Sequence, residues 1–150
     1  GRVQKGFQER IQHLEVEMKV EPDLPDIVIE RDFLLDVFVN IVKNAVESMP
    51  DGGNLTISSI QSVFRGRPSV EVSVMDTGAG ITPENLPRIF DLYFSTKERG
   101  LGFGLWRDRI VVRKYGGDIE VRSTVGEGTT VVIQLPINFE HNIVTVPSQG

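Results

Sequence analysis

The spacing of apolar residues changes several times along this chain, and that change constrains the fold more than any other feature. Between residues 13 and 21, apolar and polar side chains alternate, which is typical of a half-buried strand. Over residues 31–49 the apolar side chains recur every three or four positions, which predicts an amphipathic helix. A chain that combines both periods cannot be a coiled coil or another single repeated element.

The remaining pattern adds strands in hairpins and further helices. Thr82 is a suitable N-cap and Pro83 a suitable first residue for a short helix, and Gly116-Gly117 would end a later one. The order predicts an α+β fold, a two-layer sandwich in which a mixed sheet of about five strands carries about three helices on one face. The expected elements are a strand at 13–21, a helix at 31–49, strands at 55–63 and 68–75, a short helix opening at 82–84, a loop at 90–104, a helix at 105–115, and strands at 118–123 and 129–135.

Composition excludes several classes of protein. The absence of cysteine removes thiol catalysis and cysteine-ligated metal centres, and a formal net charge of −5 argues against a nucleic-acid-binding surface. Apolar runs are too short for a transmembrane helix, and the first residues lack the apolar core of a signal peptide. We therefore expect a cytoplasmic domain without membrane contact.

A polar stripe runs along the predicted helix at 31–49. Asp36, Asn40, Asn44 and Ser48 follow one another at intervals of four, so they share one face of the helix. Asparagine is unfavourable inside helices because its side chain competes for backbone hydrogen bonds. The stripe is either a solvated face or a row of oxygen atoms presented to a ligand or to Mg²⁺, which prefers oxygen ligands.

Two glycine-rich segments are candidates for binding a ligand. Asp76-Thr77-Gly78-Ala79-Gly80 follows a predicted strand, and it is either a tight turn or a place where a ligand approaches the backbone. The segment from Gly100 to Leu105 precedes a predicted helix, where exposed N–H groups favour phosphate. A flexible hinge is the alternative, but the hydroxyl of Thr96 and the ammonium of Lys97 just upstream suit a phosphate chain better.

These segments together resemble the catalytic ATP-binding domain of sensor histidine kinases, in the wider family of DNA gyrase B, Hsp90 and MutL. The resemblance covers about residues 13–136 and implies the Bergerat-type ATP-binding fold. The matching motifs are the N box at Asn40–Ala45, the G1 box at Asp76–Ile81, the F box at Phe90–Lys97, the G2 box at Gly100–Leu105, and a last motif at Gly126–Thr130.

The resemblance implies a role for each motif residue. Asp76 would accept a hydrogen bond from the adenine amino group, with Thr130 assisting through water, while Gly78 and Gly80 would let the base and ribose approach the backbone. Asn44 would bind Mg²⁺, and residues 95–101 would form a lid over ATP. Asn40 and Lys97 are the catalytic candidates, near the phosphates. The full nucleotide-binding set is Asn40, Lys43, Asn44, Asp76, Gly78, Gly80, Ile81, Thr96, Lys97, Gly100, Leu101, Gly102, Phe103, Gly104, Leu105 and Thr130.

The implied function is transfer of the γ-phosphoryl group of Mg-ATP to a histidine on another domain. Neither His13 nor His141 is followed by an acidic residue, as the phosphoacceptor histidine of the family is. A switch ATPase of the gyrase or MutL type is one alternative, although Asn40 stands where those enzymes carry an acidic base. A degenerate nucleotide-binding module is another, because Leu101 replaces the usual Thr or Ser of the G2 box.

The resemblance also implies a division of the chain and a set of partners. Residues 1–136 would form the ATP-binding catalytic domain, with 1–12 as the remnant of an upstream linker and 137–150 as a C-terminal tail. The partners would be a dimerisation and histidine phosphoacceptor domain, upstream in the same protein, and a downstream response regulator of a two-component system.

Overall fold

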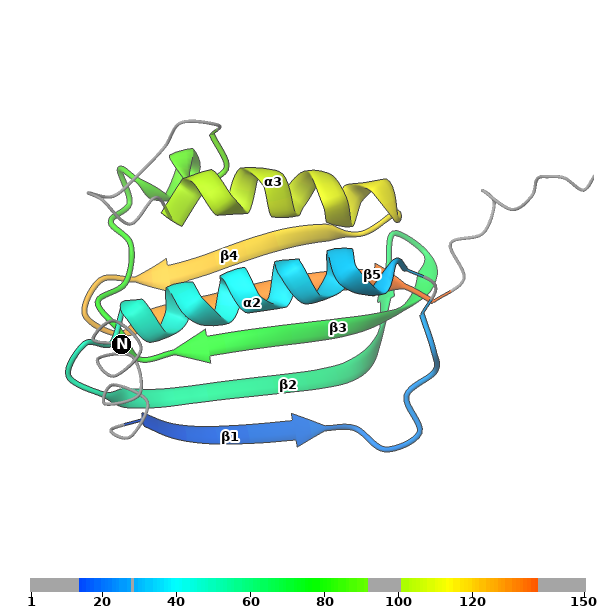
Figure 1. Ribbon diagram of the computed structural model, residues 1–150, viewed down its shortest axis with the longest axis horizontal. Coiled ribbons are helices and arrows are strands. Elements are labelled where there is room, and N and C mark those ends of the chain that lie inside the picture. The colour runs from blue at the N-terminus through cyan, green and yellow to red at the C-terminus, as the bar shows by residue number, and fades with distance from the viewer. Residues whose placement is uncertain (1–13, 28, 92–100, 138–150) are drawn as a thin grey trace, which may run out of the picture.

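The computed structural model describes residues 14–27, 29–91 and 101–137, and for residues 101–104 the backbone alone (Figure 1). Its strands and α-helices follow one another in the predicted order, and their ends lie within four residues of the expected bounds. The elements are β1 (Leu14–Val20), α2 (Arg31–Glu47), β2 (Gly53–Phe64), β3 (Arg67–Asp76), the 3₁₀-helix η1 (Leu86–Arg88), α3 (Leu101–Lys114), β4 (Asp118–Thr124) and β5 (Gly128–Pro136).

The five strands form one mixed sheet in the order β1-β2-β3-β5-β4. β1 pairs with β2 in parallel, and every other neighbouring pair is antiparallel. The central pair, β3 and β5, places Val72 opposite Ile133 and Asp76 opposite Thr129. The predicted α+β fold with a mixed five-stranded sheet is therefore confirmed.

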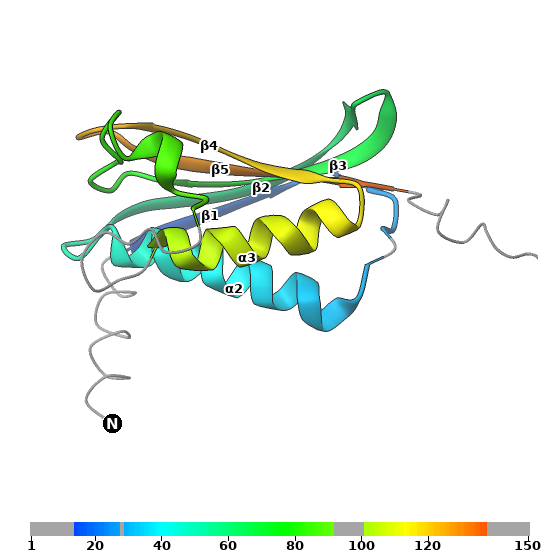
Figure 2. The ribbon, with the colours of Figure 1, turned by 90° about the horizontal axis from the view of Figure 1, so that it is seen from above.

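Both α-helices lie on the same face of the sheet (Figure 2). Each turns an apolar stripe toward the strands, and the alternating residues of β3 and β5 complete a continuous core between the two layers. Burying these side chains is the main source of stability, since each removes most of its apolar surface from water. The core includes Val37, Ile41 and Ala45 of α2, Val70, Val72 and Val74 of β3, Leu105 and Val112 of α3, and Ile133 and Leu135 of β5.

The helices differ from the sequence prediction in two places. The short helix expected after Thr82 is a turn followed by the 3₁₀-helix η1, because Pro87 has no N–H to continue an α-helical ladder. Helix α3 begins at Leu101, four residues before the expected start. The glycines that suggested a loop there lower helix stability by about 1 kcal/mol each but do not prevent helix formation.

Among the described residues, no helix is both long and apolar enough to cross a membrane.

Candidate functional site

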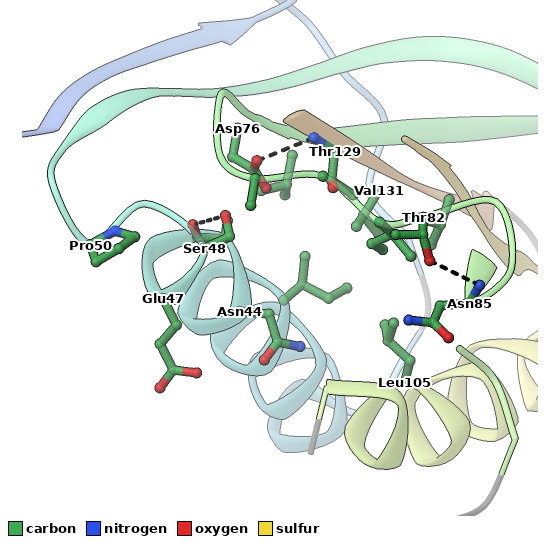
Figure 3. A pocket seen from close by; sticks show the side chains of 17 residues that line it. Asn44, Glu47, Ser48, Pro50, Asp76, Thr82, Asn85, Leu105, Thr129 and Val131 are labelled. Carbon is green, nitrogen blue, oxygen red and sulfur yellow. Dashed lines mark hydrogen bonds between the residues drawn. The ribbon is translucent and has the colours of Figure 1, made fainter. Parts of the chain in front are cut away.

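A cavity of about 470 Å³ opens between α2, the end of β3, β5 and the start of α3 (Figure 3). Its walls are mostly aliphatic, and a few polar side chains stand at its edges. This combination suits a largely apolar ligand with a small number of hydrogen-bonding groups. The lining residues are Ile41, Asn44, Ala45, Glu47, Ser48, Pro50, Val74, Asp76, Ala79, Gly80, Ile81, Thr82, Asn85, Leu105, Val121, Thr129 and Val131.

Asp76, the last residue of β3, is the carboxylate of this cavity. The residue is 6% exposed, and its Oδ1 accepts hydrogen bonds from the backbone N–H groups of Gly78 (2.8 Å) and Thr129 (3.2 Å). Burial raises the pKa of Asp76, while the hydrogen bonds from Gly78, Thr129 and the Ser48 hydroxyl act in the opposite direction. Because both backbone donors bind Oδ1, Oδ2 is the oxygen best placed to accept a hydrogen bond from a ligand.

The glycines after Asp76 allow the loop to dock against the rest of the protein. A Cβ atom on Gly78 would lie 2.5 Å from the backbone oxygen of Ser48 at the end of α2. Gly80 has a φ of +79°, and a Cβ there would lie 2.4 Å from the backbone oxygen of Thr124. Protein atoms, including the backbone oxygens of Ser48 and Thr124, occupy the place that a side chain would take at these two glycines. The approach of base and ribose that the resemblance implies stays a prediction. Of the two, Gly80 lines the cavity and Gly78 does not.

The polar stripe of α2 divides between the cavity and the neighbouring helix. Asn44 lines the cavity, and its buried Nδ2 has no hydrogen-bond partner among the described residues. Asn40, one turn earlier, does not line the cavity: its Nδ2 donates to Asp108 Oδ2 of α3 at 2.7 Å. Lys43 is exposed and also stands outside the cavity lining.

Thr129, and not the predicted Thr130, lines the cavity. Residues alternate between the two faces of a strand, and Thr129 shares its face with Val131 and with Asp76 opposite it. Thr130 pairs with Met75 and belongs to the other face. The adjacent predicted residues Ile81 and Leu105 both contribute apolar walls.

Several predicted residues are not placed relative to the cavity. Thr96, Lys97 and Gly100, with most of the lid at 95–101, lie outside the described residues, as do the segments 1–12 and 138–150 and both histidines. Leu101, Gly102, Phe103 and Gly104 form the backbone of the first turn of α3, which begins near the cavity wall at Leu105.

Asp108 is the charged residue that motif reasoning missed. It is 1% exposed, and burial raises its pKa to about 6 in spite of its hydrogen bond with Asn40 and the nearby charge of Arg107. The signal was present in the sequence: Asp108 lies three residues after Leu105 and four before Val112, which places a carboxylate on the apolar face of α3.

The comparison with known families agrees with this geometry. Residues 29–138 match the family described as "Histidine kinase-, DNA gyrase B-, and HSP90-like ATPase". The chain is also similar to the structure of the nucleotide-free catalytic domain of histidine kinase ThkA, with a TM-score of 0.75 and 26% sequence identity over 93% of this chain and 90% of that one.

Curated relatives are kinases of much greater length. Sporulation kinase E of Bacillus subtilis (strain 168) is 36% identical over 130 residues, covering 87% of this chain and 17% of that protein. Sensor histidine kinase ZraS of Escherichia coli (strain K12) is 35% identical over 116 residues, covering 77% of this chain and 24% of that protein. The chain thus spans less than a quarter of the length of these relatives. It belongs to the histidine kinase-, DNA gyrase B-, and HSP90-like ATPase family, as a catalytic ATP-binding domain of the sensor histidine kinase type.

Proposed function

We propose that this chain binds Mg-ATP and transfers the γ-phosphoryl group to a histidine on a separate helical domain. One observation carries the proposal: Asp76 stands at the edge of an apolar cavity with Oδ1 held by two backbone N–H groups. A carboxylate oxygen fixed in this way can read the exocyclic amine of adenine. The aliphatic walls formed by Ile81, Leu105 and Val131 would pack against the two faces of the base.

Asn44 fits a Mg²⁺ ion that accompanies the nucleotide. Its amide lines the cavity and has a buried nitrogen without a partner, so the group gains by meeting a ligand. The oxygen of the same amide is a suitable donor for Mg²⁺, which usually binds one or two protein oxygens together with phosphate oxygens and water. A bound Mg²⁺ would supply neutralisation of the phosphate charge.

The phosphate chain would lie beside the start of α3. The first turn of a helix carries N–H groups that are not bonded within the helix, and at Leu101 these belong to the glycine-rich segment. Thr96, Lys97 and Gly100 remain the proposed phosphate-binding residues upstream of it. Asn40 and Lys97 are the proposed catalytic residues, because phosphoryl transfer needs mainly positioning and compensation of charge.

Transfer is favoured over hydrolysis because Asn40 stands at the position where the switch ATPases of the family carry an acidic base. Asn40 cannot accept a proton. Asp108 lies next to it, but with an exposure of 1% its carboxylate does not reach solvent. A positioned base typically contributes about 10²–10⁴-fold, so hydrolysis should be slow even with ATP bound.

The partners proposed are a dimerisation domain with the phosphoacceptor histidine and a response regulator that receives the phosphoryl group. The names of the curated relatives support the first, since sensor histidine kinase ZraS and the sporulation kinases are much longer than this chain. The proposed location is the cytoplasm, where ATP is available.

Calorimetric titration of the chain with ATP, with and without Mg²⁺, tests the proposal. We expect Mg²⁺ to strengthen ATP binding, and Asn44→Ala to remove most of that gain while metal-free ADP binding changes little. Asn54→Ala is the matched control, because Asn54 is exposed and outside the cavity. An unchanged Mg²⁺ effect in Asn44→Ala would exclude Asn44 as the metal ligand.

Phosphoryl transfer is measured with γ-labelled ATP, with and without a histidine-bearing helical domain. Label should move to that domain and not to this chain. Stable label on this chain alone, or rapid release of phosphate, would contradict the proposed reaction.

A further inference from the structure

Asp108 occupies a position that packing alone would give to an apolar residue. It lies on the face of α3 turned toward the core, between the fully buried Leu105 and Val112. Helix α3 packs against α2 along this face, and Asp108 reaches across to Asn40 of α2, whose Nδ2 donates to its Oδ2 at 2.7 Å. The two residues form a polar contact inside the layer of helices.

Burying the Asp108 carboxylate in this contact costs folding free energy, so stability does not explain why an aspartate stands here. Moving a carboxylate out of water is costly, and one hydrogen bond from a neutral amide compensates only in part. The charge of Arg107 favours the ionised carboxylate, and the charge of Asp36, one turn before Asn40, opposes it. An aliphatic side chain of similar size would pack in the same place without this cost.

The hydrogen bond between Asn40 and Asp108 determines which end of the Asn40 amide is available to a ligand. An amide offers N–H donors at one end and an acceptor oxygen at the other, and the two ends differ by a half-turn of the same side chain. An ionised carboxylate can only accept. Asp108 therefore binds the nitrogen of Asn40, and Oδ1 has no hydrogen bond within the part of the chain that the structure describes.

We propose that Asp108 is a positioning residue for the nucleotide site, which holds the amide of Asn40 with Oδ1 free and ties its orientation to helix α3. The inference rests on the proposed function, in which Asn40 acts near the phosphates. It adds that the orientation of Asn40 is set from the helix whose first turn is the glycine-rich segment. Movement of α3 relative to α2 would therefore change Asn40 directly.

Three variants of the 150-residue chain separate this role from a purely structural one. Asp108→Val removes the acceptor and keeps a compact core side chain. Asp108→Asn keeps an oxygen that can accept from Asn40 but adds N–H groups that can donate to Asn40 Oδ1 instead, so it should retain the orientation only in part. Val112→Ala is the matched control, because it removes buried volume from the same face of α3 without touching Asn40.

Mg-ATP binding by calorimetry is the first measurement. Asp108→Val should weaken Mg-ATP binding by about 10-fold, a coupling of the size measured between contacting residues. Val112→Ala should stay within about 2-fold of wild type, and Asp108→Asn should fall between wild type and Asp108→Val. In an Asn40→Ala background, Asp108→Val should have no further effect. The same loss in both backgrounds, or no loss in either, would overturn the proposal.

The side-chain amide signals of Asn40 in a ¹⁵N spectrum are the second measurement, and they do not depend on nucleotide. One Nδ2 proton should carry the shift and slow exchange of a hydrogen bond in wild type, keep them in part in Asp108→Asn, and lose both in Asp108→Val. Signals that are identical in all three variants would refute the contact. If wild type binds no Mg-ATP while the amide signals behave as expected, the proposed function fails and the orienting contact stands.

Discussion

Two buried aspartates, Asp76 and Asp108, show how differently the same side chain is held in two regions of this molecule. Both are almost inaccessible to solvent, and burial raises the pKa of both. Asp76 Oδ1 receives two hydrogen bonds from backbone N–H groups at the edge of a cavity. Asp108 receives its bond from a side chain, in the contact between two helices.

The two aspartates differ in how freely their hydrogen-bond donors can move. Backbone donors are fixed by the strand and the loop, so Asp76 keeps its orientation whether or not a ligand is present. Asn40 can turn its amide, so the contact of Asp108 depends on a single rotatable side chain. The cavity edge is therefore rigid, whereas the polar contact of the helices can respond to movement.

The largest loss of ATP affinity is expected from Asp76→Asn. The Gly78 and Thr129 N–H groups would retain the amide oxygen, so the amide nitrogen would take the place of Oδ2 and face the adenine amine, donor against donor. A buried donor without a partner costs about 1–3 kcal/mol, so ATP affinity should fall by about 10- to 100-fold. Calorimetry measures this, and the thermal midpoint shows whether the fold persists.

Asp51→Asn is the control for that substitution, since Asp51 is exposed in the turn after α2. Equal ATP affinity in the Asp76→Asn and Asp51→Asn proteins would show that Asp76 does not bind the nucleotide.

A smaller loss of ATP affinity is expected from Gly78→Ala, which disturbs the loop that donates to Asp76. The added Cβ would meet the Ser48 backbone oxygen at 2.5 Å, so the loop must withdraw from the end of α2. Overpacking of this kind typically lowers the free energy of unfolding by about 1–3 kcal/mol. Chemical denaturation measures the loss, and ATP binding should weaken with it.

Gly66→Asn is the matched control for Gly78→Ala. Nothing lies within 4 Å of a Cβ at Gly66, and asparagine tolerates the positive φ of that turn. If both substitutions left stability unchanged, the proposed docking of the loop on α2 would be incorrect.

The smallest effect concerns the pH dependence of stability. The pKa of Asp108 is raised to about 6, so the folded protein holds this proton more tightly than the unfolded chain does. Stability from this group is present at low pH and is lost as pH rises through 6, by about 1 kcal/mol between pH 5 and 7. Denaturation curves of wild type and Asp108→Asn at both pH values measure the difference, which should be smaller by about this amount in Asp108→Asn.

Asp118 provides an internal contrast of opposite sign. Burial opposes its ionisation, but hydrogen bonds from Arg113 and Arg109 outweigh burial and lower its pKa to about 2. Stability from Asp118 is therefore present above pH 4 and is lost as pH falls toward 2. A wild-type protein whose stability rises between pH 5 and 7 would contradict the raised pKa of Asp108.

The order of strands and helices could be predicted from sequence, because the spacing of apolar residues distinguishes a strand from a helix and shows which face is buried. The bounds of α3 could not, because glycine is compatible with a loop and with a helix, and tertiary packing decides between them. Thr129 and Thr130 are adjacent identical residues in a strand, so only the pairing with β3 shows which one faces the cavity.

Other parts of the site depend on distant contacts. The sequence predicts that Asp76 ends a strand, but not that Thr129, 53 residues later, supplies one of its hydrogen bonds. Asn40 and Asp108 are separated by 68 residues, and nothing local in either helix indicates their pairing. Polar stripes and isolated charges on apolar faces mark such residues without identifying their partners.

The pairing of β3 with β5 has a mechanical consequence. That ladder of hydrogen bonds is the seam, meaning the boundary in the sheet between two parts of the chain. The earlier part contains β1, α2, β2 and β3, and the later part contains α3, β4 and β5. The cavity lies across the seam, since Asp76 and Asn44 come from one side and Leu105, Thr129 and Val131 from the other. A nucleotide in the cavity would act as a clasp between the two parts, so a force that separates them would have to break nucleotide contacts as well as the backbone ladder.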